Sequence, residues 1–181
     1  MNRREETNRR ILDGAAAAFV KAGYAGTSME EIASAAGVSK LLLYRDFVGK
    51  RELYQAVLQR TVQRITERVP AEGSNRALRE LLAAARDDPD GFTLMFRHAA
   101  REPEFAGYAE SLTADAIQHS EQILRGIEPD PALRRWAAEM TVHMTYQAII
   151  TWLAHGDPAR DDAFFQRLLA VNRTVAKPLQ E

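Results

Sequence analysis

Basic and hydroxyl-bearing side chains gather in one short segment near the start of the chain. Ser39, Lys40, Tyr44 and Arg45 fall within seven residues, and Lys50 follows closely. Ammonium and guanidinium groups donate hydrogen bonds to phosphate oxygens and to guanine, and hydroxyl groups donate to phosphates. Recognition of double-stranded DNA is the chemistry that this pattern predicts.

Two short helices must hold these side chains in place, and the first is predicted from its ends. Thr27-x-x-Glu30 is interpreted as a capping box that opens it. Ile32 and Ala36 supply an apolar stripe of helical period. Gly37 stands where a left-handed residue ends a helix.

The second helix is predicted over residues 40–47. Ser39 is its N-cap, and Leu43 and Phe47 fall four residues apart on its inner face. The outer face then carries the basic and hydroxyl-bearing residues. Two such helices form a helix–turn–helix motif over residues 28–47, which can place its second helix in the major groove.

The segment GVSKLLLYRDFVGKREL, residues 37–53, resembles the recognition segment of the tetracycline-repressor (TetR) family of transcriptional regulators. Two positions depart from the family pattern. Leu41 stands where a small residue or proline is more usual, and Asp46 stands where histidine is common. Asp46 is expected to pair with Lys50 or Arg45 instead of facing DNA. The resemblance covers about the first third of the chain and includes Arg10-Ile11-Leu12, Ala15-Ala16, Phe19, Gly23-Tyr24 and Thr27-Ser28-Met29.

Each predicted DNA contact has its own chemistry. Lys40, in the first turn of the second helix, could donate to guanine O6 or N7. One of Leu41 and Leu42 could meet a thymine methyl group while the other packs inward. The resemblance implies backbone contacts for Tyr44 and Lys50. The full set of predicted DNA-binding residues is Thr27, Ser28, Ser39, Lys40, Leu41, Leu42, Tyr44, Arg45 and Lys50.

The charge distribution agrees weakly with DNA binding. The net charge of the 181-residue chain is −1, but residues 1–60 carry a net charge of +3 and the remainder −4. Local charge matters more than total charge because attraction to phosphates is screened within about 10 Å. Arg3, Arg4, Arg9 and Arg10 open the chain, either as a solvated helix start or as an arm that touches DNA.

The remaining sequence predicts helices only. No run shows the alternating pattern of a strand, and prolines start several apolar segments of helical period. We therefore expect an all-α fold of about nine helices: a helix–turn–helix DNA-binding domain over residues 1–50 and an effector-binding and dimerisation domain over residues 51–181. The clearest linker-like break is at 71–75. The later helices are predicted at 75–87, 90–101, 103–126, 130–155 and 158–178.

The last two predicted helices are apolar almost all round. Such helices must be buried on two sides, so they favour a four-helix dimer interface with two helices from each subunit. The alternative is the core of a monomer. The resemblance implies the dimer, and the predicted interface residues are Phe164, Leu168, Val171 and Val175.

Aromatic and sulfur-containing residues gather in the middle of the chain. They could be ordinary core, or they could line an apolar small-molecule pocket with a few polar groups. The resemblance implies such a pocket in the C-terminal domain. The predicted lining residues are Phe92, Phe96, Tyr108, Trp136, Met140, His143 and Tyr146.

Catalysis and metal binding are not expected. The four histidines lack the Glu-x-x-His spacing of di-iron bundles, and no nucleophile or phosphate-loop motif occurs. No catalytic residue, metal site or cofactor is predicted. The absence of cysteine, of a signal segment and of a long apolar run favours a cytoplasmic protein without a membrane anchor.

The sequence therefore predicts a homodimeric, ligand-responsive repressor. It would leave a palindromic DNA operator when a small apolar or aromatic effector binds. Two alternatives stay open: a small-molecule-binding helical protein with weakened DNA binding, and a helical metal protein or enzyme.

Overall fold

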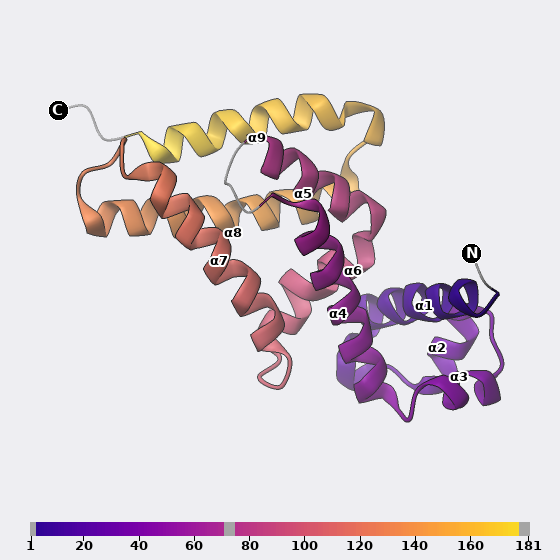
Figure 1. Cartoon of the computed structure of the whole chain (residues 1–181). Helices are drawn as coiled ribbons and strands as arrows, with labels where there is room; N and C mark the ends of the chain where they lie inside the picture. The colour runs from indigo at the N-terminus through magenta and orange to yellow at the C-terminus, as the bar shows by residue number, and fades with distance from the viewer. Residues whose placement is uncertain (1–2, 71–74, 178–181) are drawn as a thin grey trace. The chain divides into compact units, whose positions relative to one another are not determined.

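The computed structural model describes residues 3–70 and 75–177, and every regular element in these ranges is a helix (Figure 1). The predicted all-α fold of about nine helices is thus confirmed for the described residues. The predicted break at 71–75 falls almost entirely outside them. None of the described helices is long and apolar enough to cross a membrane.

The helices are α1 Arg3–Gly26, α2 Met29–Ala36, α3 Lys40–Asp46, α4 Lys50–Arg68, α5 Asn75–Asp87, α6 Pro89–Thr93, the π-helix η1 Leu94–His98, the 3-10 helix η2 Ala99–Arg101, α7 Ala106–Leu124, α8 Pro131–His155, the 3-10 helix η3 Pro158–Arg160 and α9 Asp161–Ala176.

The chain divides into two compact units. The first is Met1–Arg64 with Asp88–Tyr108, and the second is Ile65–Asp87 with Ala109–Glu181. Helix α4 begins in the first unit and ends in the second. The boundary between the two compact units does not fall at residue 50, where the domain boundary was predicted from the sequence. The predicted boundary between a DNA-binding and an effector-binding domain therefore remains a prediction.

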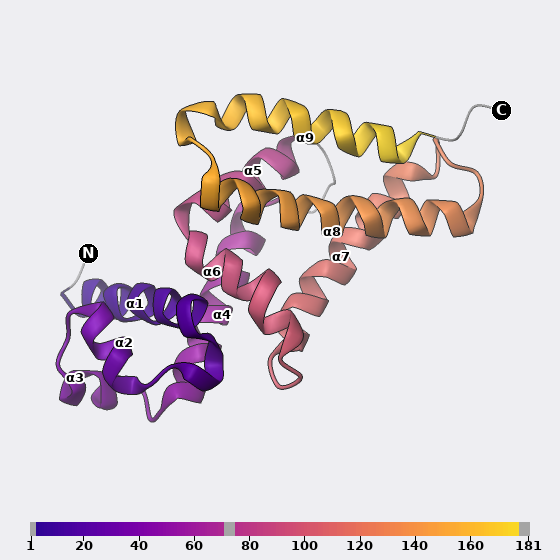
Figure 2. The ribbon, with the colours of Figure 1, turned by 180° about the vertical axis from the view of Figure 1, so that it is seen from behind.

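In the first unit, α1 packs closely against α2 (Figure 2). Ile11 and Phe19 of α1, Ile32 of α2 and Leu43 of α3 are fully buried in the shared core. The two backbones meet at Gly14, where a Cβ atom would lie 2.5 Å from the Ala36 nitrogen. A side chain at position 14 would therefore push α2, and the helix that follows it, out of place.

Four aromatic rings continue this core toward α4. The Tyr54 ring lies 4.8 Å from the Phe19 ring, 5.1 Å from the Tyr24 ring and 4.4 Å from the Phe105 ring, measured between centroids. Burial raises the pKa of Tyr54 well above its ordinary value. The cluster fixes the first half of α4 against α1 and the segment before α7.

In the second unit, α8 and α9 form an antiparallel pair that packs beside α5 (Figures 1 and 2). Asp161, at the start of α9, joins three helices. It accepts hydrogen bonds from Arg86 of α5 at 2.7 and 3.0 Å and from the Trp152 indole of α8 at 2.6 Å. The Arg86 guanidinium holds the pKa of Asp161 below its usual range.

Candidate DNA-binding surface and ligand cavity

Helix α2 begins with a capping box one residue later than the sequence analysis placed it. The Ser28 hydroxyl accepts from the Glu31 N–H at 3.2 Å, and the Glu31 carboxylate accepts from the Ser28 N–H at 2.7 Å. The predicted pair of Thr27 and Glu30 is therefore wrong. The Ser28 hydroxyl also donates to Glu31 at 2.9 Å, so a carboxylate already occupies this helix N-terminus.

Thr27 lies inside the first unit and does not face solvent. Its side chain is 3% exposed, and its hydroxyl donates to the carbonyls of Gly23 at 2.7 Å and Ala18 at 3.2 Å. A hydroxyl bound in this way holds α1 to the start of α2. The structure thus contradicts the predicted contact between Thr27 and DNA.

The turn between α2 and α3 has the predicted geometry. Gly37 is left-handed with φ of 62°, a conformation that costs glycine no steric strain. The Ser39 hydroxyl accepts from the Leu42 N–H at 3.2 Å and caps α3. Arg10 of α1 donates to the carbonyls of Ala36 at 3.0 Å and Gly37 at 2.8 Å, so α1 also secures the end of α2.

Helix α3 turns Leu43 and the C-cap residue Phe47 into the core and four other side chains outward. We call Lys40, Leu41, Tyr44 and Arg45 the recognition face. Leu41 is 83% exposed, whereas Leu42 is half-buried, so Leu41 is the member of this pair that faces outward. An exposed leucine at the leading end of α3 is available for apolar contact with a thymine methyl group.

Each of the cations on and beside this face has a partner within the first unit. Lys40 pairs with Glu30 of α2, and this hydrogen bond lowers the pKa of Glu30 and raises that of Lys40. Arg45 donates to both oxygens of Asp46, at 2.9 and 2.8 Å, as predicted for Asp46. The Lys50 ammonium lies 4.7 Å from the Tyr24 ring centroid and donates to the Ala25 carbonyl at 3.4 Å. Glu30 is exposed, so a phosphate could replace it as the partner of Lys40, whereas the Asp46 side chain is only 14% exposed.

A groove of about 1000 Å³ runs beside the recognition face. Its walls carry four arginines and two acids: Arg3, Arg4, Arg10, Arg45, Glu6 and Asp46. Helix α1 already begins at Arg3, so the described part of the N-terminus is a helix start and not an extended arm. The excess of guanidinium groups suits an anionic DNA backbone.

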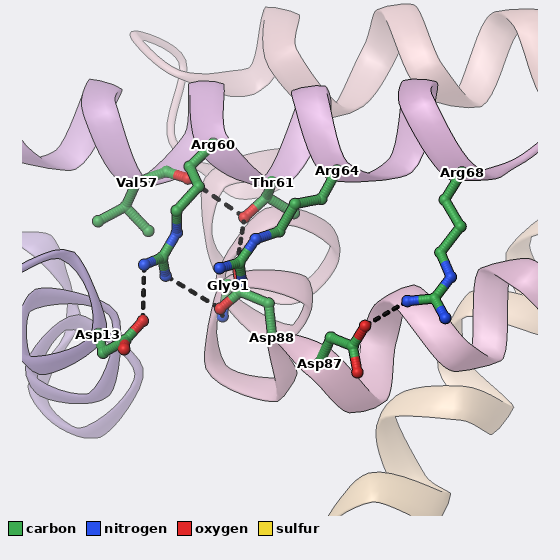
Figure 3. A network of polar contacts seen from close by, with 9 residues as sticks. All are labelled: Asp13, Val57, Arg60, Thr61, Arg64, Arg68, Asp87, Asp88 and Gly91. Atoms are coloured by element: carbon green, nitrogen blue, oxygen red, sulfur yellow. Dashed lines mark hydrogen bonds and ion pairs between the residues drawn. The ribbon is translucent and has the colours of Figure 1, made fainter. Parts of the chain in front are cut away.

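A buried ion network fixes α4 within the first unit (Figure 3). Arg60 donates to Asp88 at 3.0 Å and to Asp13 of α1 at 2.6 Å, and Arg64 lies 3.0 Å from the second Asp88 oxygen. Asp88 also caps α6, accepting from the Gly91 N–H at 3.3 Å. The Asp88 carboxylate thus ties α4 to α6, and Arg60 extends the network to α1 through Asp13.

The end of α4 has its own partners in the second unit. Arg68 donates to Glu80 of α5 at 3.0 Å. It also pairs with Asp87 (Figure 3). Helix α4 is therefore held by ion pairs in each unit, from Arg60 near its middle in the first unit and from Arg68 at its C-terminal end in the second.

The second unit contains a cavity of about 400 Å³ among α5, α7, α8 and α9. Of the seven predicted pocket residues, only Tyr146 lines it. Phe92, Phe96 and Tyr108 belong to the first unit, and Phe92 is buried there. Trp136, Met140 and His143 are exposed on the opposite face of α8. These six residues do not line this cavity because the prediction pooled aromatic residues without regard to the helix face on which each one lies. The apolar wall consists of Val69, Leu78, Leu81, Ala116, Ile123, Leu124, Ile127, Val142 and Leu169.

Helices α8 and α9 both expose apolar side chains. Leu133, Trp136 and Met140 are partly exposed at helical spacing, and so is Val171 of α9. Phe164 and Val175 are half-buried, but Leu168 is only 5% exposed and belongs to the unit's own core. We call Leu133, Trp136, Met140 and Val171 the apolar face.

Three polar residues of the cavity were not predicted from the sequence. Thr141 and Thr145 are one helical turn apart on the same side of α8 as Tyr146, and Asn172 faces them from α9. The spacing of Thr141, Thr145 and Tyr146 could have indicated a shared face. No sequence signal connects Asn172 to that face.

Comparisons with known proteins agree with the geometry. Residues 11–57 match the family model described as bacterial regulatory proteins, tetR family. The HTH-type transcriptional activator FasR of Mycolicibacterium smegmatis is 32% identical over 173 residues, which cover 88% of this chain and 78% of FasR. The HTH-type transcriptional repressor Rv1474c of Mycobacterium tuberculosis is 27% identical, over 84% of this chain and 85% of the repressor. A TetR-like transcriptional regulator from Rhodococcus sp. RHA1 has the same fold, with a TM-score of 0.79, 24% identity and coverage of 95% and 97% of the two chains.

Proposed function

Because the chain belongs to the TetR family of DNA-binding transcriptional regulators, we propose that it is a homodimeric, ligand-responsive repressor that acts in the cytoplasm. The recognition face carries this proposal: a capped helix presents Lys40, Leu41 and Tyr44 outward from a rigid core. A short helix held in this way can enter the major groove without reordering.

The contacts to DNA divide into readout and positioning. Lys40 exchanges Glu30 for a guanine, and Leu41 meets a thymine methyl group. Tyr44, Lys50 and the arginines of the groove hold the phosphate backbone. Ser39 and Leu42 lie at the rim of that groove and support the leading end of α3.

Dimerisation uses the apolar face of α8 and α9. A second copy of the chain covers Leu133, Trp136, Met140 and Val171, which are otherwise left partly in water. The two helix–turn–helix motifs then bind a near-palindromic operator. The centres of its half-sites are separated by about 34–36 Å or by a multiple of that distance.

The effector binds in the cavity of the second unit. Its binding favours a conformation in which the two motifs no longer match the operator, which requires tighter binding to that conformation than to the DNA-bound one. Helix α4 carries the change because it belongs to both units. FasR is named an activator and Rv1474c a repressor; we propose repression, with release by the effector.

Selection of bound duplexes from random DNA tests the proposal. The full-length protein should enrich a near-palindrome, and its affinity should fall steeply with salt because several phosphates are neutralised. A protein that enriches no motif and shows no salt-dependent binding would be a ligand-binding relative with a lost DNA function.

Within the selected operator, Lys40→Ala is expected to relax base preference. Loss of one guanine contact should weaken binding of the selected operator about tenfold and remove the preference at one symmetric pair of positions. Repeating the duplex selection with the variant measures this directly. Unchanged base preference would show that Lys40 contacts only the backbone.

Lys50→Ala provides the contrast. It should weaken binding of every sequence about equally and reduce the slope of log affinity against log salt by roughly one. Lys177→Ala, at an exposed lysine after α9, should leave both quantities unchanged.

A further inference from the structure

The cavity of the second unit contains two buried polar atoms that no described residue satisfies. They are the Thr141 hydroxyl oxygen and the Asn172 side-chain oxygen. A buried polar group without a hydrogen bond costs considerable free energy, so such atoms commonly have a functional reason. Both lie in a wall that is otherwise mostly apolar.

The Thr141 hydroxyl differs from the hydroxyls of two other threonines on α8 and α9. Thr151 and Thr174 donate to the carbonyl four residues earlier, at 2.9 and 3.0 Å. Among the described residues Thr141 makes no such bond, and its hydroxyl lies in the cavity wall. This hydroxyl is therefore available both to donate to a ligand and to accept from one.

Asn172 has one half of its amide fixed and the other half unused. Its amide nitrogen donates to the Thr145 hydroxyl at 3.2 Å, which holds the amide against α8. Its oxygen is buried and accepts from no described residue. The cavity thus offers a fixed hydrogen-bond acceptor at this point.

The two atoms belong to neighbouring parts of the same cavity wall. Thr141 and Thr145 are four residues apart on α8, about 6 Å along the helix, and Asn172 is bonded to Thr145. A hydroxyl group, which donates once and accepts as well, matches an acceptor and a donor in one wall. A carboxylate does not match, because it cannot donate and the Asn172 oxygen would repel it.

We propose that the effector is an uncharged apolar molecule whose hydroxyl group donates to the Asn172 oxygen and accepts from the Thr141 hydroxyl. This inference rests on the proposed function and specifies the effector's chemistry. Arg173 is the one Lys, Arg, Asp or Glu side chain among the described lining residues, and it is exposed, so the buried end of the cavity suits a neutral group.

Matched probes test the hydroxyl requirement on the full chain. Isothermal titration calorimetry would compare 1-octanol with its isomer heptyl methyl ether, and 4-butylphenol with 4-butylanisole. Each ether keeps an acceptor but has no donor. The hydroxyl compound of each pair should bind roughly tenfold more tightly. Octanoate should bind more weakly than 1-octanol.

Two variants locate the preference. Asn172→Leu and Thr141→Val should each reduce the discrimination between hydroxyl compound and ether to about twofold or less while ether binding persists. Thr174→Val, whose hydroxyl donates to Ala170 outside the cavity, should keep the full preference.

Three outcomes would overturn the inference. Equal binding of hydroxyl compounds and ethers, or tighter binding of octanoate, would remove the hydroxyl requirement and leave the effector pocket standing. A preference that survives in both variants would place recognition elsewhere. If none of the five probes binds, both the inference and the effector part of the proposed function are wrong. DNA binding is tested separately by the selection of operator duplexes.

Discussion

Asp88→Ala is expected to lower the free energy of unfolding of the first unit by about 3–5 kcal/mol. The Asp88 side chain is 7% exposed and lies between two guanidinium groups. Its removal leaves Arg60, which is 12% exposed, as a buried charge without its main partner. The helix cap of α6 is lost as well, which alone typically costs about 1 kcal/mol.

The expected measurement is hydrogen exchange of backbone amides in α1 and α6, which reports the opening free energy of this unit. Operator affinity should fall with it, since α1 braces the recognition helix. Asp13→Ala is a matched control: Asp13 binds the same Arg60 at 2.6 Å but is 54% exposed. Its loss should cost no more than about 1 kcal/mol. If Asp88→Ala and Asp13→Ala lowered the free energy of unfolding equally, the burial of Asp88 would not be what makes its ion pairs stabilising.

The helix–turn–helix could be predicted because its signals are local. The Ser39 cap, the left-handed Gly37 and the inward pair Leu43 and Phe47 each act within one or two helical turns. The capping box was misplaced by one residue because Thr27 and Ser28 both carry hydroxyls. Only the tertiary contact of Thr27 with α1 distinguishes them.

The cavity could not be predicted because its position depends on which segments pack together. The segment 88–108 joins α1 in the first unit, although it follows α5 in the chain. Phe92 and Phe96 therefore never reach the cavity. Helix α8 is apolar on two sides, and composition alone does not tell the side that lines the cavity from the side that carries Trp136.

Charge placement was partly predictable. Adjacent residues of opposite sign, such as Arg45 and Asp46, pair because they are close in the chain. The Arg60 and Asp88 pair joins residues 28 positions apart, and no periodic pattern relates them. Long-range ion pairs of this kind become visible only once the helices are placed.

Trp136→Glu is expected to split the dimer and to weaken operator binding by about 10²–10⁴-fold. Trp136 is 55% exposed in the single chain and lies at the middle of the apolar face, with Leu133 and Met140 on the same side of α8. A glutamate there would place a charge without a partner in an apolar interface, which is strongly unfavourable. The affinity loss follows because two linked motifs bind far more tightly than one, without any change in the contacts of either.

Sedimentation at micromolar concentration measures the first effect: the wild type should sediment at about twice the 20.3 kDa chain mass, and the variant at the mass of one chain. Gln118→Glu adds the same charge at an exposed position on α7 and should leave both mass and operator affinity unchanged. Leu168 is unsuitable for this test, because it is buried in its own unit and a charge there would unfold α9. A Trp136→Glu protein that remains dimeric would place the interface elsewhere, and a monomeric variant with full operator affinity would remove the need for two motifs. The two readouts together therefore separate where the subunits meet from whether their meeting is what allows DNA to be recognised.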